Sequence, residues 1–154
     1  NNLSGPASYI ADKKLPPFFY DTINMENGKE VEPGLRWMRY TKCIQAACAS
    51  PDVHTVITDS LTSVSEYLID HIMRTEGQKQ MRIQDWQPFK FMLSRMVNYM
   101  RLTGKLIIMT AHESVEKDEV DGIIKYFVMV PSRLKDTFAG MFSDAWRTEC
   151  EQIG

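Results

Sequence analysis

The chain has 154 residues, about the length of one domain, and 44% of them are hydrophobic and 25% charged. This balance is typical of a globular domain with a hydrophobic core and argues against a disordered chain. The net charge of −2 and the pI of about 5.9 exclude a general electrostatic attraction to nucleic acids, although they allow a local basic patch.

The cysteines and the hydropathy pattern bear on where the protein works. No apolar run approaches the length of a membrane span, so we expect no membrane segment. The three cysteines, Cys43, Cys48 and Cys150, contain no CxxC pair and leave one thiol over in any pairing. Free thiols in a reducing compartment are therefore expected, which favours the cytoplasm.

The first third of the chain predicts two short elements and one helix. Residues 8–14 are compatible with a short helix, and the aromatic residues of 18–22 predict a strand that ends in Asp21-Thr22. The polar residues 24–33 predict an exposed loop. Apolar residues at helical spacing then predict a helix over 35–49.

The middle of the chain alternates strands and helices. A β-branched run predicts a buried strand over 53–59, followed by a helix over 62–75. The clearest helix begins after Asp85, which is a candidate cap, and ends at Gly104. A second apolar run, residues 105–113, predicts another core strand.

The last part of the chain is richer in strand signals. Residues 123–130 predict a strand that Pro131 ends, residues 138–142 are ambiguous, and residues 145–150 are a candidate last strand. The whole order predicts one α/β domain over 1–154: a mainly parallel sheet flanked by helices on both faces, with antiparallel strands toward the C-terminus.

A polar pair follows the first core strand. Asp59-Ser60 after Val56-Ile57-Thr58 fits a Walker B strand, in which an acid at the strand end holds the water shell of Mg²⁺ beside a nucleotide phosphate. The alternative is structural, because Asp59, Ser60 or Thr62 can cap the helix that follows. Both interpretations stay open on this pattern alone.

The second core strand ends in Thr110-Ala111-His112-Glu113. His112 is suited to sense a γ-phosphate because it donates hydrogen bonds, and Glu113 is a candidate general base. The alternatives are a histidine satisfied by nearby backbone and a solvated glutamate. An unrelated α/β enzyme that uses the two as an acid–base pair would lack a nucleophile.

These stretches together resemble the RecA-like P-loop ATPases of phages, the AAA-type nucleotide-binding proteins that accompany single-strand annealing. The resemblance spans nearly the whole chain. It is carried in order by Ser4-Gly5-Pro6, residues 18–22, Val56 to Ser60, Trp86, Ile107 to Glu113, residues 129–135 and Phe142 to Trp146.

The resemblance implies a RecA-like core that binds ATP and Mg²⁺ and acts in phage or bacterial DNA recombination or replication, in the host cytoplasm if the protein is phage-encoded. Asp59 would take the Walker B role with Ser60 beside it, His112 the sensor role and Glu113 the catalytic base. Gly5, Pro6, Ala7 and Ser8 would form the phosphate loop, with Ser8 and Asp59 at the metal. Single-stranded DNA or recombination proteins would be partners of a homo-oligomer, with Arg133 and Lys135 as candidates at its interface.

The chain departs from this family pattern at two places. A Walker A loop needs a Gly-Lys pair, and the chain has none after Gly5, so the loop near residues 5–9 is degenerate or missing. The position where a glutamate is expected holds Ile23, and Glu26 is out of register.

The departures leave a second hypothesis beside the ATPase: a catalytically silent P-loop relic that acts as an assembly module or binds single-stranded DNA. For DNA the sequence offers only dispersed basic residues with nearby aromatics, namely Arg36, Arg39, Lys42, Arg82, Lys90, Arg95 and Arg101.

Overall fold

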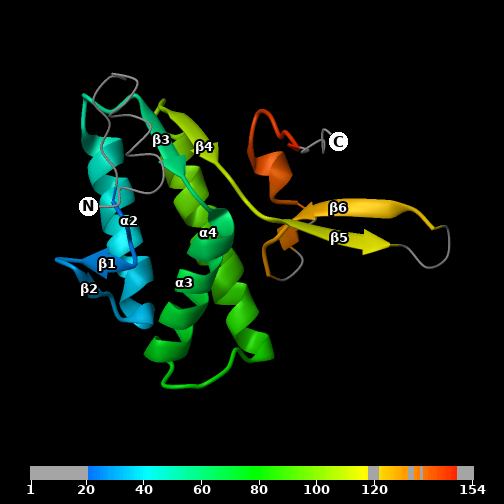
Figure 1. Ribbon diagram of the computed structural model, residues 1–154, viewed down its shortest axis with the longest axis horizontal. Coiled ribbons are helices and arrows are strands. Elements are labelled where there is room, and N and C mark those ends of the chain that lie inside the picture. Colours follow the sequence, from blue (N-terminus) through cyan, green and yellow to red (C-terminus); the bar gives the residue numbers. More distant parts are fainter. Residues whose placement is uncertain (1–20, 118–121, 132–133, 136, 149–154) are drawn as a thin grey trace, which may run out of the picture.

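The computed structural model describes residues 21–117, 122–131, 134–135 and 137–148, and shows a mixed α/β fold with small sheets (Figure 1). Within this part, no helix is long and apolar enough to cross a membrane. The predicted helix at residues 8–14 lies outside the described residues, as does most of the strand predicted for 18–22. Three helices carry most of the packing: α2 (Pro33–Ala49), α3 (Leu61–Thr75) and α4 (Trp86–Arg101).

The two core strands predicted from the sequence are present and lie side by side. β3 (Thr55–Thr58) pairs in parallel with β4 (Leu106–Met109), with Thr55 opposite Leu106 and Thr58 opposite Met109. The chain between them passes through α3, the short 3₁₀ helix η1 (Ile83–Asp85) and α4. Residues 110–112, predicted as part of the second strand, lie beyond β4.

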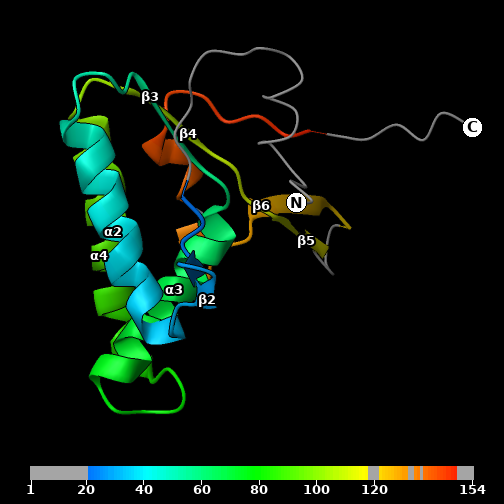
Figure 2. The same cartoon turned by 60° about the vertical axis from the view of Figure 1, so that its left-hand side comes forward.

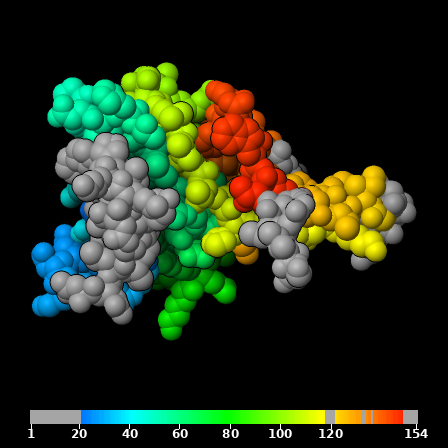
Figure 3. Space-filling model, turned by 45° about the horizontal axis from the view of Figure 1, so that its top comes forward, coloured from blue at the N-terminus to red at the C-terminus, as the bar shows by residue number. Residues whose placement is uncertain are grey.

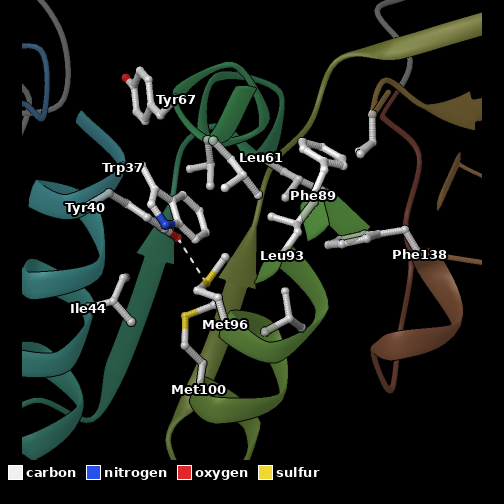
Figure 4. Packing of buried hydrophobic residues seen from close by; sticks show 14 of the residues in the cluster. Trp37, Tyr40, Ile44, Leu61, Tyr67, Phe89, Leu93, Met96, Met100 and Phe138 are labelled. Atoms are coloured by element: carbon white, nitrogen blue, oxygen red, sulfur yellow. Dashed lines mark hydrogen bonds between the residues drawn. The ribbon is translucent and has the colours of Figure 1, made fainter. Parts of the chain in front are cut away.

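The helices cover one face of this parallel pair. Val56 and Thr58 are buried toward the helices, whereas Ile57 on the opposite face is 55% exposed and Leu106 60% exposed. Figures 2 and 4 show the helices gathered on one side of β3 and β4, with Trp37, Leu61 and Phe89 among the side chains between them. Within the described residues the helices lie on one face of this pair, so the predicted helices on both faces are not found there.

A hairpin extends from this body near the C-terminus. β5 (Glu113–Lys117) pairs antiparallel with β6 (Ile124–Val128), and the hairpin projects outward in Figure 3. β6 confirms the strand predicted for residues 123–130, whereas β5 was not predicted and the two strands form a sheet of their own. Val130, Leu134 and Phe138, which follow the hairpin, are buried in the core and anchor it there. Residues 138–142 contain a short 3₁₀ helix, η3 (Ala139–Met141), and residues 145–148 of the predicted last strand are not a strand.

The segment predicted as an exposed loop before α2 is exposed but contains a small hairpin. β1 (Met25–Glu26) pairs antiparallel with β2 (Lys29–Glu30). Asn27 and Gly28 between them have φ angles of 50° and 77°. Two consecutive residues with positive φ are what a tight two-residue hairpin turn requires, and Asn-Gly adopts this conformation readily.

Gly34 gives a prediction about how α2 packs on α3. A Cβ at this position would lie 2.3 Å from Arg74 Cδ and 2.8 Å from Arg74 Cβ. Alanine favours a helix over glycine by about 1 kcal/mol, but the clash involves an atom that cannot swing away. We expect Gly34→Ala to lower the free energy of unfolding by about 1–3 kcal/mol in urea denaturation. Gly140→Ala, with nothing within 4 Å of the added carbon, is the control and should be near neutral.

Asp85 has a different role from the cap of α4 that was predicted for it. Its buried carboxylate does not cap α4 but closes η1, accepting hydrogen bonds from Arg82 N at 2.7 Å and Gln78 Nε2 at 2.6 Å. The hydrogen bond from the Arg82 side chain, together with these contacts, lowers the Asp85 pKa from 3.8 to about 2. Because the folded pKa lies below the ordinary value, the stabilisation is complete above about pH 4 and is lost as the pH falls toward 2.

We therefore expect Asp85→Asn to lower the thermal unfolding midpoint at pH 7, and the gap from the unmutated chain to close as the pH approaches 2. Asp52→Asn, at an exposed carboxylate, should show no gap at either pH. A gap for Asp85→Asn that stays constant across this range would contradict the assignment.

Candidate functional site

The ends of β3 and β4 bring Asp59 and Thr110 together. Each residue directly follows its strand, and the parallel register places them next to each other. Thr110 Oγ1 donates a hydrogen bond to Asp59 Oδ1, and Thr110 N donates to Thr58 O at 3.0 Å. The Asp59 side chain is thus oriented by the neighbouring strand while its residue stays exposed.

Ser60 is the residue that caps α3. Its side-chain oxygen accepts a hydrogen bond from Ser63 N at 3.3 Å, and its backbone is extended, as a cap requires. Leu61 N donates to Thr110 O at 2.8 Å, which ties the start of α3 to the end of β4. The capping alternative is therefore confirmed for Ser60, whereas Asp59 is left to present its carboxylate at the start of the helix.

Thr58, one residue before Asp59, is fixed from the other side by α2. Its buried hydroxyl forms a hydrogen bond of 2.9 Å with the hydroxyl of Tyr40. Burial raises the pKa of Tyr40 above its ordinary value, so the phenol stays neutral. Tyr40 also contacts Met96 of α4, as the dashed line in Figure 4 shows. The strand end that carries Asp59 is therefore held by two helices.

His112 lies at the same end of the parallel pair as Asp59. Its backbone N–H donates to Thr62 Oγ1 at 3.1 Å, and its carbonyl accepts from Met129 N at 2.8 Å. Thr62 in turn donates to Met129 O at 3.1 Å. These bonds fix the backbone of His112 between the first turn of α3 and the segment after β6, and leave the residue exposed.

Glu113 is the first residue of β5 and is held by an ion pair. Arg147 Nε lies 2.5 Å from Glu113 Oε2, and the Arg147 guanidinium lies 3.7 Å from the ring centre of Tyr126. The carboxylate predicted as a general base is therefore bound to an arginine that is itself stacked on the hairpin. Lys135, predicted at an interface, is also engaged within the chain, by an ion pair with Glu116. Arg133 lies outside the described residues.

Near the position of the expected glutamate, the carboxylates among the described residues are ion-paired. Ile23 is partly buried and packs against the hydrophobic core. Glu26 is ion-paired with Arg39 at 2.6 Å, and Arg39 also bonds Asp21 at 2.8 Å, which lowers the pKa of Asp21. Arg39 thus neutralises both acidic residues near Ile23.

The residues predicted to bind phosphate and metal lie in two separate parts of the chain. Gly5, Pro6, Ala7 and Ser8 lie outside the described residues. Among the residues that the structure does describe, no group of three or more His, Cys, Asp or Glu side chains is placed to hold a metal. Mg²⁺ in nucleotide sites needs fewer protein ligands, since one or two carboxylates act together with phosphates and waters. Asp59 is the one carboxylate that the described residues place at the shared end of β3 and β4, with Oδ1 accepting a hydrogen bond from Thr110.

Sequence reasoning singled out Asp59, Ser60, His112 and Glu113. It named Thr110 only as part of the motif after the second strand and Thr62 only as a possible helix cap, and it did not name Tyr40. Thr110, Thr62 and Tyr40 make the contacts that fix the strand end.

Comparisons of the chain with family models, curated proteins and solved structures found no match.

Proposed function

We propose that the chain is a RecA-like nucleotide-binding protein that binds ATP with Mg²⁺ at the shared end of β3 and β4 and acts on DNA in recombination or replication. One observation carries the proposal: Asp59 and Thr110 follow adjacent parallel strands and are joined by a hydrogen bond. Ligands of open α/β sheets bind outside the carboxyl ends of parallel strands.

The surroundings of Asp59 suit a phosphate bound with a cation. The start of α3 directly follows Asp59-Ser60, and the N-terminus of a helix carries partial positive charge that favours anions. When bound, Mg²⁺ would neutralise phosphate oxygens. Asp59 would orient its water shell, and Thr110 would hold the Asp59 carboxylate in place. His112, exposed at the same end, is the candidate to contact the terminal phosphate. Residues Gly5 to Ser8 remain our candidates for the phosphate loop.

A second function is favoured by the state of the candidate bases. Glu113 is bound by Arg147, and the position of the expected glutamate holds the core residue Ile23. These two facts support a protein that binds nucleotide without hydrolysing it, or a silent relic that serves as an assembly or DNA-binding module. We place either protein in the cytoplasm, as a homo-oligomer.

Equilibrium titration with fluorescently labelled ATP, with and without Mg²⁺, tests the proposal, and release of inorganic phosphate measured on the same samples separates the two functions. Saturable, Mg²⁺-dependent binding with phosphate release supports the ATPase. The same binding without release supports the silent nucleotide-binding form. Lack of saturable binding by the unmutated chain would overturn the nucleotide proposal.

A further inference from the structure

A groove of about 360 Å³ runs between α2 and α4. Figure 2 shows the two helices next to each other, and Figure 4 shows Trp37 of α2 and Met96 of α4 facing one another. These two side chains are buried at the base of the groove, whereas Phe91 is 62% exposed and Tyr99 42% exposed. Thr41, Ile44, Gln45, Met92 and Arg95 complete the lining.

Three exposed residues of α4 line this groove: an aromatic residue, then an arginine, then a second aromatic residue. Phe91, Arg95 and Tyr99 are spaced by four residues, so they share one face of the helix. Each step advances about 6 Å along the axis, which puts the two aromatic positions about 12 Å apart. Flat rings separated by an arginine are the side chains on which unpaired bases stack.

The charge of the two helices is opposite to that of the chain as a whole. Acidic residues outnumber lysine and arginine by 20 to 18. Yet α2 and α4 contain no Asp or Glu and carry six cationic side chains: Arg36, Arg39, Lys42, Lys90, Arg95 and Arg101.

Ion pairs neutralise only part of this positive charge. Arg36 is paired with Glu30, and Arg39 with Asp21 and Glu26. Lys42, Lys90, Arg95 and Arg101 form no ion pair with any residue that the structure describes. Of these, only Arg95 lines the groove, which therefore carries one positive charge that no described carboxylate pairs with.

This composition favours a polyanion with aromatic faces over an apolar peptide helix. A peptide helix in a groove is held by a continuous apolar strip. Here Arg95 interrupts the exposed rings of α4, and Thr41 and Gln45 face them from α2. Single-stranded DNA offers both the phosphates for the cations and the bases for the rings, whereas in a duplex the bases are already stacked at about 3.4 Å.

We propose that the groove between α2 and α4 binds single-stranded DNA, with bases stacked on Phe91 and Tyr99 and a phosphate contacted by Arg95. The inference gives a location to the DNA part of the proposed function, on which it rests for the choice of partner. It does not depend on nucleotide binding at Asp59.

The test is fluorescence anisotropy of a labelled oligothymidine of roughly 15 nucleotides, a length that exceeds the usual site of one small domain, titrated with the full chain at several salt concentrations. We expect Phe91→Leu and Tyr99→Leu each to weaken binding on the order of tenfold, and Phe91→Tyr to retain it. Because each phosphate contact to a single strand contributes about 0.7 to the slope of log affinity against log salt, Arg95→Gln should lower that slope by about 0.7.

The controls are matched in exposure and charge. Ile83→Ala removes a side chain that is 92% exposed outside the groove, and Lys79→Gln removes one positive charge from the exposed loop between α3 and α4. Both should bind the oligonucleotide as the unmutated chain does, and a duplex of the same length should bind more weakly. Equal thermal unfolding midpoints for all variants would show that none has lost its fold.

The inference is overturned if Phe91→Leu, Tyr99→Leu and the controls bind alike. It is also overturned if the two leucine variants alter only self-association in sedimentation velocity, which would make the groove a protein interface. Asp59→Asn separates this site from the nucleotide site, because that variant should keep oligonucleotide binding in the absence of ATP. If only ATP binding fails, the proposal that the groove binds single-stranded DNA is not contradicted.

Discussion

Phe89→Ala is expected to lower the free energy of unfolding by about 3–5 kcal/mol, the range for removing a fully buried ring. Phe89 is 0% exposed and packs edge-on against Trp86, with ring centres 5.6 Å apart. Figure 4 shows it among Leu61, Leu93 and Phe138, so its ring joins α4 to α3 and to the segment after the hairpin. Since domains are stable by only about 5–15 kcal/mol, this one change should remove a large share of the stability.

Phe91→Ala provides the matched control two residues along the same helix. Its ring is mostly exposed, so the free energy of unfolding should change by less than about 0.5 kcal/mol. Urea denaturation followed by circular dichroism measures both variants. Similar losses for Phe89→Ala and Phe91→Ala would show that the face of α4 assigned to the core is wrong.

Asp59→Asn is expected to weaken Mg²⁺-dependent ATP binding on the order of 100-fold or more. Residues that only support a metal ligand typically contribute 10- to 100-fold to metal affinity, and Asp59 is proposed to act more directly. Thr110→Val removes the hydroxyl that orients Asp59, and we expect a loss of roughly tenfold. Isothermal titration calorimetry with Mg²⁺ and ATP measures both changes.

Asp52→Asn is the control for this series, because Asp52 is exposed and precedes β3 at its other end. It changes the net charge of the chain by the same amount as Asp59→Asn. If the two variants lose affinity equally, the effect is one of net charge and no specific site lies at Asp59.

Much of the fold follows from local patterns in the sequence. The helical spacing of Phe89, Leu93 and Met96 predicted α4, and the runs of β-branched residues predicted β3 and β4. The hairpin of β1 and β2 was missed although Asn27-Gly28 is a hairpin signal. Its two strands are only two residues long and exposed throughout, too short to show an alternation of apolar and polar positions.

Caps were harder to assign than helices. Asp59, Ser60 and Thr62 are all able to cap α3, and only the backbone geometry selects Ser60. Asp85 was placed at the start of α4 by its type, but its carboxylate is used by Arg82 and Gln78. A cap depends on the direction of one side chain, which composition does not specify.

Residues of the site were predictable from the sequence only where they come directly after a predicted strand. Asp59 and His112 were found because each follows an apolar run. The contacts that position the residues of this site join parts of the chain that are far apart in sequence, such as Tyr40 with Thr58 and Glu113 with Arg147. One sequence contains no signal for such pairs. The role of Glu113 as a base stays a prediction, and its ion pair with Arg147 argues that the pair must open first.

The most direct test of the nucleotide site is to replace Mg²⁺ by paramagnetic Mn²⁺ and follow backbone amide signals by NMR in the presence of ATP. β3 is four residues long, so its first and last residues lie about 10 Å apart, and broadening falls steeply with distance from the ion. We predict that the amides of Asp59, Ser60, Thr110 and His112 lose intensity first, while those of Val53 and His54 at the other end of β3 keep theirs. Broadening centred on that other end, or elsewhere in the fold, would contradict the account.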